Sequence, residues 1–365
     1  TNNGTTNNVV ADNAVIEALL ATSVTTTQDG LSADVTFEVP ENTQSVVVTL
    51  VGTNPTLYTL DLWDNGDGSN LVTDGWTNSD PGRLYQLCLS CKQRITIGTG
   101  AFAALIPGND KVTVQPGTHT IRIKSWSGLT NAPVVGDVDI FVLGKIAETR
   151  PSTGTLDVNL HFTGSNGWTA ATAPTDASFQ KMLEDVDGVW SQAGLQLGEI
   201  KYYDIDSRFE VIEDAAQPGS TELPEMFALS RNADDQAVNV FFVDTLLLGG
   251  GLDGQGILLG IAGGIPGPAG TMGTARSGVA LISKSNPFLP TPLYKVFAHE
   301  VGHFLGLYHT SEQNRGFGTQ VHDELGDTPE NDMRLLMHNT GTGDVLSETQ
   351  GNVLRLNPWV ANGGE

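Results

Sequence analysis

The most restrictive feature of this sequence is the spacing of three histidines between positions 299 and 309. His299 and His303 are four residues apart, so a helix would place them one turn apart on the same face. Gly306 follows His303 by three residues and suits the left-handed backbone conformation that often ends a helix. Beyond such a turn the chain can bring His309 back toward the first two rings. The pattern predicts a helix over about 292–305 and a place where three imidazoles meet.

Three neutral imidazole nitrogens can bind zinc and leave a fourth position for water, as catalytic zinc sites do. Glu300 sits beside His299 on the predicted helix, where its carboxylate can hold and deprotonate a zinc-activated water. Thr291, followed by Pro292, is the expected N-cap of this helix. We therefore expect His299, His303 and His309 to be zinc ligands and Glu300 to be a general base.

These residues match His-Glu-x-x-His-x-x-Gly-x-x-His, and residues 155–360 resemble the metzincin metallopeptidases in this motif. The resemblance implies a zinc endopeptidase with a methionine turn beneath the metal. Met337, which follows two leucines, is the residue that we assign to this turn, and Met333 lacks such apolar neighbours. Asn339 stands where some members of the family have a tyrosine, so the sequence does not identify a protein group that stabilises the oxyanion.

Two finer expectations also come from the resemblance. Thr310 and the segment 327–329 (Asp-Thr-Pro) look most like the pappalysin-type branch of the metzincins. The segment 277–281 is expected to be the edge strand of the sheet and to pair with an extended substrate. Pairing of this kind gives affinity through the backbone without strong sequence selectivity.

The two halves of the chain differ in pattern. Residues 28–147 alternate between apolar and polar side chains in short runs separated by turns, which predicts an all-β sandwich of jelly-roll-like type. After a linker at 148–154, strands alternate with helices over 155–365. We expect this second half to be an α+β metzincin-like zinc protease domain with a mixed twisted sheet and an active-site helix. Residues 1–27 are expected to be a flexible leader.

Composition limits the partners and the location of the chain. A net charge of −24 with only 18 Lys and Arg leaves no basic stripe for nucleic acid. No apolar stretch reaches the roughly 20 residues that a transmembrane helix needs. Polarity comes mainly from Thr, Asn, Ser and Gly, and the chain begins at Thr1 rather than Met. We expect a mature protein that is secreted or displayed at the cell surface.

Two further features leave alternatives open. The only two cysteines, Cys88 and Cys91, favour a local disulfide, and the alternative is a thiol that blocks the zinc in a latent form. Acidic residues gather in two segments, which either bind calcium through their oxygen atoms or are solvated turns. They are Asp61, Asp64 and Asp67 in the first half, and Asp323 and Asp327 close to the zinc motif.

The function we expect is that of a secreted zinc endopeptidase acting on a protein or peptide substrate. The alternative is an extracellular or cell-surface structural or binding protein whose β-sandwich mediates adhesion or self-assembly, with proteolysis secondary or idle. A third interpretation makes residues 28–147 an inhibitory prodomain. An idle domain should have lost a zinc ligand or Glu300, and this sequence keeps them all.

Overall fold

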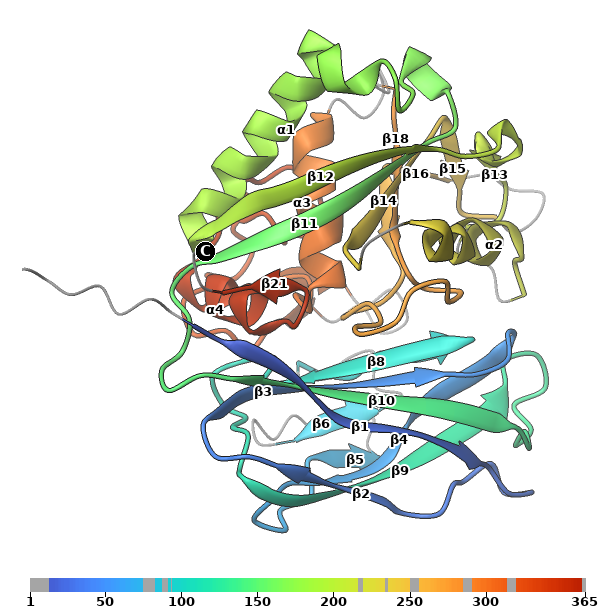
Figure 1. Ribbon diagram of the computed structural model, residues 1–365, viewed down its shortest axis with the longest axis vertical. Coiled ribbons are helices and arrows are strands. Elements are labelled where there is room, and N and C mark those ends of the chain that lie inside the picture. Colours follow the sequence, from blue (N-terminus) through green and yellow to red (C-terminus); the bar gives the residue numbers. More distant parts are fainter. Residues whose placement is uncertain are drawn as a thin grey trace, which may run out of the picture.

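The computed structural model describes residues 13–74, 83–86, 91–92, 94–215, 219–233, 236–249, 256–284, 291–313 and 320–362. An N-terminal part made of strands lies beneath a C-terminal part that mixes strands and helices (Figure 1). Among the described residues, no helix is both long enough and apolar enough to cross a membrane.

Two antiparallel four-stranded sheets build the N-terminal part, with the strand orders β1-β10-β3-β8 and β2-β9-β4-β7. Both sheets contribute large side chains, among them Trp63 of β4 and Phe102 of β8, to one buried core. A two-stranded parallel sheet, β5-β6, completes this part. The strands are β1 Val15–Thr25, β2 Val35–Val39, β3 Thr43–Val51, β4 Thr56–Asp64, β5 Val72–Asp74, β6 Leu84–Gln86, β7 Gly98–Thr99, β8 Ala101–Ile106, β9 Gly117–Ser127 and β10 Asp137–Ile146.

The first strand corrects the expectation of a flexible leader over 1–27. Val15–Thr25 forms β1 and pairs antiparallel with β10 along its whole length. Leu19, Leu20 and Val24 pack against the core between the two sheets, which explains why this segment is ordered. Residues 1–12 of the expected leader lie outside the described residues.

A mixed sheet of order β12-β11-β14-β18-β17, with β21 beside β11, organises the C-terminal part. β11, β12, β14 and β18 are parallel to one another, whereas β17 is antiparallel to β18. The segment 277–281 was expected to be the edge strand; this is wrong, because β18 lies between β14 and β17, and β17 is at the edge. The strands are β11 Gly154–Phe162, β12 Leu195–Asp204, β14 Val238–Val243, β17 Gly260–Ala262, β18 Val279–Ile282 and β21 Val360–Ala361.

Helices cover both faces of this sheet. The alternation of β14 shows how, because Val240 and Phe242 belong to the core with helices α1 and α3, whereas Phe241 and Val243 belong to the core with α2. The helices are α1 Ala177–Trp190, α2 Glu222–Ala228, α3 Leu293–Phe304 and α4 Glu348–Leu356. Smaller elements are β13 Val211–Ile212, β15 Thr245–Leu247, β16 Ile257–Leu258, β19 Ser311–Gln313, β20 Gln320–His322 and 3-10 turns at Ser165–Gly167, Ala173–Thr175, Ser191–Ala193, Ser207–Phe209 and Leu229–Asn232.

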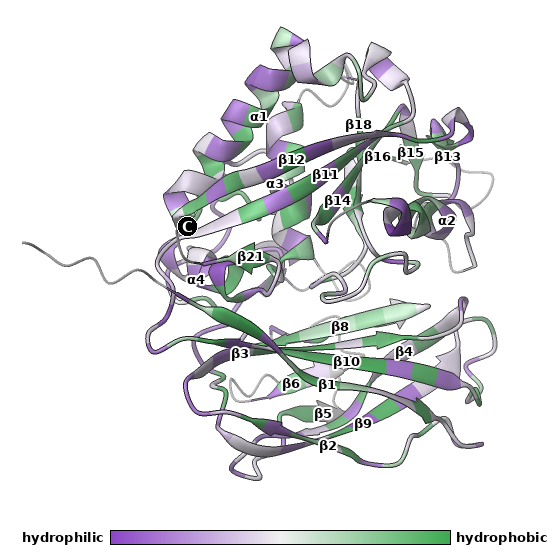
Figure 2. Ribbon diagram, viewed as in Figure 1, coloured by the Kyte–Doolittle hydropathy of each residue, from purple (hydrophilic) through white to green (hydrophobic). Residues whose placement is uncertain are grey.

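The sheet β1-β10-β3-β8 joins the two parts because both of its faces are buried, one in the N-terminal core and the other in the C-terminal core. Val46 and Val48 of β3 point into the N-terminal core, while Val47 between them belongs to the C-terminal core. Ala103 and Leu105 of β8 join Val47 there. Figure 2 shows that β3 and β8 are hydrophobic along most of their length, as strands covered on both faces should be.

A buried lysine strengthens this junction. Lys145 of β10 is fully buried, and its Nζ donates hydrogen bonds to the carbonyls of Arg355, Asn357 and Val360 at 2.6, 2.9 and 2.7 Å. These carbonyls lie at the end of α4 and just beyond it, where helix carbonyls lack partners within the helix. The N-terminal part therefore caps the last helix of the C-terminal part.

Candidate metal centre

The first two histidines lie on α3, whose ends are set by its flanking residues. Pro292 is the N-cap, and its carbonyl accepts hydrogen bonds from the amides of Lys295 and Val296 at 3.0 and 3.4 Å. The expected cap, Thr291, is therefore one residue too early. After the helix, Gly306 has φ +117°, a conformation that favours glycine, and a Cβ there would lie 3.0 Å from Cδ2 of Leu105. This turn sends the chain back toward the helix.

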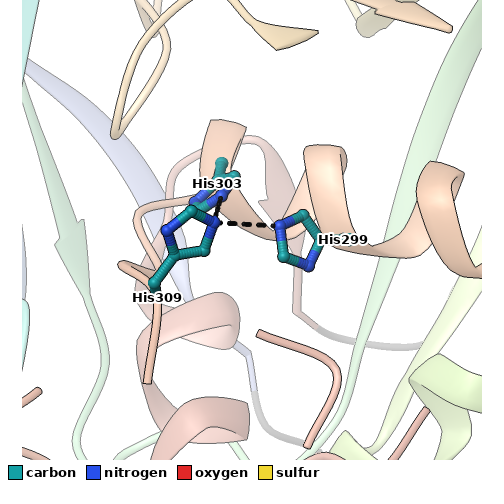
Figure 3. A group of neighbouring side chains, drawn as sticks. All are labelled: His299, His303 and His309. Carbon is teal, nitrogen blue, oxygen red and sulfur yellow. Dashed lines mark hydrogen bonds between the residues drawn. The ribbon is translucent and has the colours of Figure 1, made fainter. Parts of the chain in front are cut away.

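The three histidine rings meet as the spacing predicts. The Nε2 atom of His309 lies 3.3 Å from Nε2 of His299 and 3.1 Å from Nε2 of His303 (Figure 3). His299 and His303 extend from the same helix, and His309 faces them from the segment that follows it. Among the described residues, this trio is the one group of His, Cys, Asp and Glu side chains close enough together to hold a metal ion.

Each ring presents its other nitrogen to an oxygen atom that only accepts hydrogen bonds. The Nδ1 atoms of His299 and His303 lie 2.7 and 2.6 Å from the carbonyl oxygens of Leu336 and Leu307. The hydrogen of each ring is thereby assigned to Nδ1, which leaves a lone pair on Nε2. Burial, together with the neighbouring histidines, lowers the pKa of His299 to about 4 and that of His303 well below its usual value.

The third ring follows the same rule with a side chain as its partner. The Nδ1 atom of His309 lies 2.9 Å from Oε2 of Glu312. Three lone pairs therefore face one another, and they cannot hydrogen-bond among themselves. Imidazole nitrogens about 2.0–2.1 Å from a tetrahedral zinc ion lie roughly 3.3 Å apart. The trio thus fits zinc in its donor atoms, its tautomers and its spacing.

Glu300 follows His299 on α3, and its side chain lies against the edge strand β17. A Cβ atom at Gly260 of β17 would lie 2.6 Å from Cγ of Glu300, so only glycine leaves room for this side chain. Burial raises the pKa of Glu300 to about 8, a hydrogen bond from the backbone of Ala262 acts against this shift, and the positive charge of a zinc ion held by the histidines would act against it too and favour the carboxylate. The carboxylate is therefore held beside the edge of the sheet, next to the ligand helix.

Met337 lies directly beneath the ligand helix. It is fully buried, and a Cβ at Gly302 would be 2.8 Å from its Sδ. Its carbonyl accepts a hydrogen bond of 2.8 Å from the amide of Thr310, next to the third histidine. Met333, the weaker candidate, is 56% exposed. Met337 is thus where a methionine turn would have to be, and its assignment to that turn stays a prediction.

Two of the three acidic residues expected to bind calcium in the N-terminal part, Asp61 and Asp67, have protein partners. Asp61 forms an ion pair of 3.1 Å with Arg122 of β9. Asp67 accepts hydrogen bonds from the amide and the hydroxyl of Ser69 at 2.9 and 2.6 Å, and Asp64 ends β4. These contacts describe a hydrogen-bonded turn, and calcium binding there stays a prediction.

The two acidic residues near the zinc motif each accept hydrogen bonds from neighbouring groups. Asp327 accepts a hydrogen bond of 3.0 Å from the amide of Thr349 at the start of α4. Asp323 accepts one of 2.5 Å from the hydroxyl of Thr328, and its Oδ2 is buried and has no hydrogen-bond partner among the described residues. Burial raises the pKa of Asp323 to about 6. Calcium at Asp323 and Asp327 remains a prediction.

Two residues of the site, Glu312 and Arg94, were not predicted from the sequence. Glu312 binds His309, and Arg94 of the N-terminal part forms an ion pair with Glu312. Burial acts against ionisation of Glu312, but the hydrogen bond from His309 and the charge of Arg94 hold its pKa at about 2. An acidic residue three positions after a ligand histidine is a sequence pattern from which the role of Glu312 could have been predicted. Arg94 is 218 residues away in the sequence, and no local pattern marks it.

The sequence comparison points to the same part of the chain. Residues 176–310 match the family model described as metallo-peptidase family M12B, reprolysin-like. The matched segment runs from the start of α1 to Thr310 and includes all three histidines. This match supports the metzincin-like expectation but not the pappalysin-type branch. Among curated proteins, none matches the chain.

Structural comparison gives weaker likenesses. The metalloproteinase-II from Bacteroides fragilis is 10% identical, with a TM-score of 0.33 over 64% of each chain, so this chain spans under two thirds of that protein. A family two carbohydrate esterase from Clostridium thermocellum, in complex with cellohexaose, is 8% identical with a TM-score of 0.16 over 60% of each chain. The family likeness rests on the sequence match alone: residues 176–310 are similar to reprolysin-like metallopeptidase domains.

Proposed function

We propose that the chain is a secreted, zinc-dependent endopeptidase in which Glu300 is the general base. One observation carries this proposal: Nε2 of His309 lies 3.3 and 3.1 Å from Nε2 of His299 and His303, each atom bears its lone pair, and Glu300 lies on the helix that carries the first two histidines. The reprolysin-like match over 176–310 supports it independently of this geometry.

Each residue of the site has a distinct part in peptide hydrolysis. A zinc ion held by the trio would supply a Lewis acid that polarises the scissile carbonyl and lowers the pKa of water. Glu300 takes the proton of the attacking water and delivers it to the leaving amine. The carbonyls of Leu336 and Leu307 fix two of the rings so that Nε2 faces the metal.

The edge strand β17 offers a place for an extended substrate. In the described part of the chain, β17 pairs with β18 on one side and with no strand on the other. A cleft of about 310 Å³ adjoins it, lined by Leu57 of the N-terminal part and by Leu223 and Phe227 of α2. We propose that a protein or peptide substrate adds a strand to β17 and places an apolar side chain in this cleft.

Secretion and domain organisation belong to the same proposal. Cys91 is disulfide-bonded, and Cys88, the only other cysteine of the chain, lies outside the described residues. Disulfides persist in oxidising, extracellular environments. We propose a jelly-roll-like β-sandwich over 28–147, extended at its start by β1, a linker at 148–154 and a peptidase domain over 155–365.

Substitution of the base tests the proposal. In Glu300→Gln, we expect about one zinc per chain by plasma mass spectrometry, as in the wild type. Cleavage of a peptide library should fall by about 10²–10⁴-fold, the usual contribution of general acid–base catalysis. Chelation should abolish wild-type cleavage, and added zinc should restore it. Substantial cleavage by the Gln variant would overturn the role of Glu300.

A second variant probes the placement of the base. Gly260→Ala adds a methyl group that must displace Glu300, and it touches no ligand. We expect it to keep its zinc and to lose most of its peptide cleavage. Full activity of this variant would show that the position of Glu300 against β17 does not matter.

A further inference from the structure

A residue of the N-terminal part reaches the metal centre through one carboxylate. Arg94 Nη2 forms an ion pair with Oε1 of Glu312, and Oε2 of the same carboxylate lies 2.9 Å from Nδ1 of His309. The two oxygens of Glu312 are thus divided between the arginine and the histidine. The side chains of Arg94 and Glu312 are only 14% and 25% exposed, so solvent screens this pair less than a surface ion pair.

The same arginine also contacts the residue before the ligand. Its guanidinium carbon lies 5.0 Å from the centroid of the Tyr308 ring, a cation–π distance. The hydroxyl of Tyr308 donates a hydrogen bond of 3.4 Å to the carbonyl of Ile265. Arg94 therefore acts on two successive residues, Tyr308 and, through Glu312, His309.

The third ligand needs this support more than the other two. His299 and His303 are held on α3, and their Nδ1 atoms bind backbone carbonyls of the C-terminal part. His309 lies beyond the helix, and its Nδ1 binds a side chain that can rotate. The orientation of the Glu312 carboxylate must be fixed before it can orient a ring. In the described structure, that constraint comes from Arg94.

We propose that Arg94 is a positioning residue for His309, so that the N-terminal part is built into the metal centre and is not a detachable propeptide. This inference rests on the metal site of the proposed function. The shared core around Val47, Ala103 and Leu105 and the cap formed by Lys145 fix the position of Arg94 relative to Glu312. Partners of metal-bound histidines typically contribute 10–100-fold to metal affinity.

The test measures zinc affinity in the full chain, by competition with a chelator of known affinity. In Arg94→Gln we expect binding about 10–100-fold weaker. Arg94→Lys keeps the charge and should recover part of this loss. The visible spectrum of the cobalt-substituted protein should change in Arg94→Gln, because the position of a ligand changes. Wild-type affinity together with a wild-type cobalt spectrum in Arg94→Gln would overturn the proposal.

A matched control separates positioning from a general loosening of the junction. Arg276 also bridges the two parts: its side chain donates to the backbone and side-chain oxygens of Thr99 at 3.3 and 3.2 Å and to the carbonyl of Gly263 at 2.9 Å. It has no contact with Glu312 or His309 among these bonds. Arg276→Gln should lower stability and leave zinc affinity unchanged. An equal loss of zinc affinity in this variant would overturn the proposal.

A double-mutant cycle gives the sharpest result. If Arg94 acts through Glu312, then Arg94→Gln should cost little further affinity once Glu312→Gln is present. Additive losses of zinc affinity in the two variants would contradict an effect of Arg94 that passes through Glu312. None of these readouts requires catalysis, so a chain that binds zinc in this way but cleaves no peptide would refute the proposed function and leave this inference standing.

Discussion

The substitution Lys145→Met tests how firmly the two parts are joined. Lys145 is fully buried, and its ammonium group donates to three carbonyls at and beyond the end of α4. Methionine has a similar length and no donor. The variant therefore leaves three buried carbonyls without their partner, while the surrounding side chains stay in place.

The size of the effect follows from these contacts. Hydrogen bonds from a charged donor contribute about 1.5–3 kcal/mol each. Burial of Lys145 lowers its pKa to about 7, so desolvation of the ammonium offsets part of that gain. We therefore take about 1 kcal/mol per carbonyl, the lower end of the cost of an unsatisfied buried group. The free energy of unfolding should fall by about 3 kcal/mol.

Urea unfolding, followed by tryptophan fluorescence and near-ultraviolet circular dichroism, measures this loss. Because the two parts share a core, we expect both signals to change in one transition. Lys181→Met is the control, since Lys181 is 63% exposed and pairs with Asp185 one turn away on α1. Such an exposed pair contributes little to stability, because solvent screens it. A loss below about 1 kcal/mol in Lys145→Met would refute the capping role.

Three further predictions concern stability. Burial lowers the pKa of His161 to about 4, so the unfolded chain takes up a proton between pH 6.5 and 4 that the folded chain does not. Through His161 the fold should lose about 3 kcal/mol over this range, and urea titrations of His161→Gln should show that much less pH dependence. Gly306→Ala forces a side chain into φ +117° and against Leu105, and thermal unfolding should show a loss of about 1–3 kcal/mol. Asp176 caps α1 by accepting a 2.8 Å bond from the amide of Phe179, so Asp176→Ala should lower the melting temperature measured by calorimetry.

Much of the metal site could be predicted from the spacing of residues that are close together in the sequence. The histidines needed only helix geometry and a glycine turn, so the convergence of His299, His303 and His309 followed from eleven residues of sequence. The strands expected to alternate with helices over 155–365 include β14, whose apolar run Val238–Val243 is buried on both faces. Where the periodicity of a segment decides its structure, the sequence is sufficient.

What could not be predicted depends on contacts between distant segments. The order of β17 and β18 in the sheet leaves no trace in either strand, so the edge was misplaced. β1 was not predicted, because it follows a Thr- and Asn-rich segment and its partner, β10, lies more than 100 residues away in the sequence. Arg94 became part of the site only through the packing of the two parts. Such features follow from tertiary structure, which local patterns do not encode.

The two-faced sheet has a consequence for the synthesis of this protein. β3 and β8 leave the ribosome roughly 200 residues before α3, so the outward face that carries Val47, Ala103 and Leu105 has nothing to cover it at first. At a synthesis rate of about 5–20 residues per second, that face stays exposed for on the order of 10–40 s before α3 has been made. A nascent chain halted before α3 would therefore expose an apolar, aggregation-prone surface. Chaperones would have their greatest effect on the yield of folded protein during this interval.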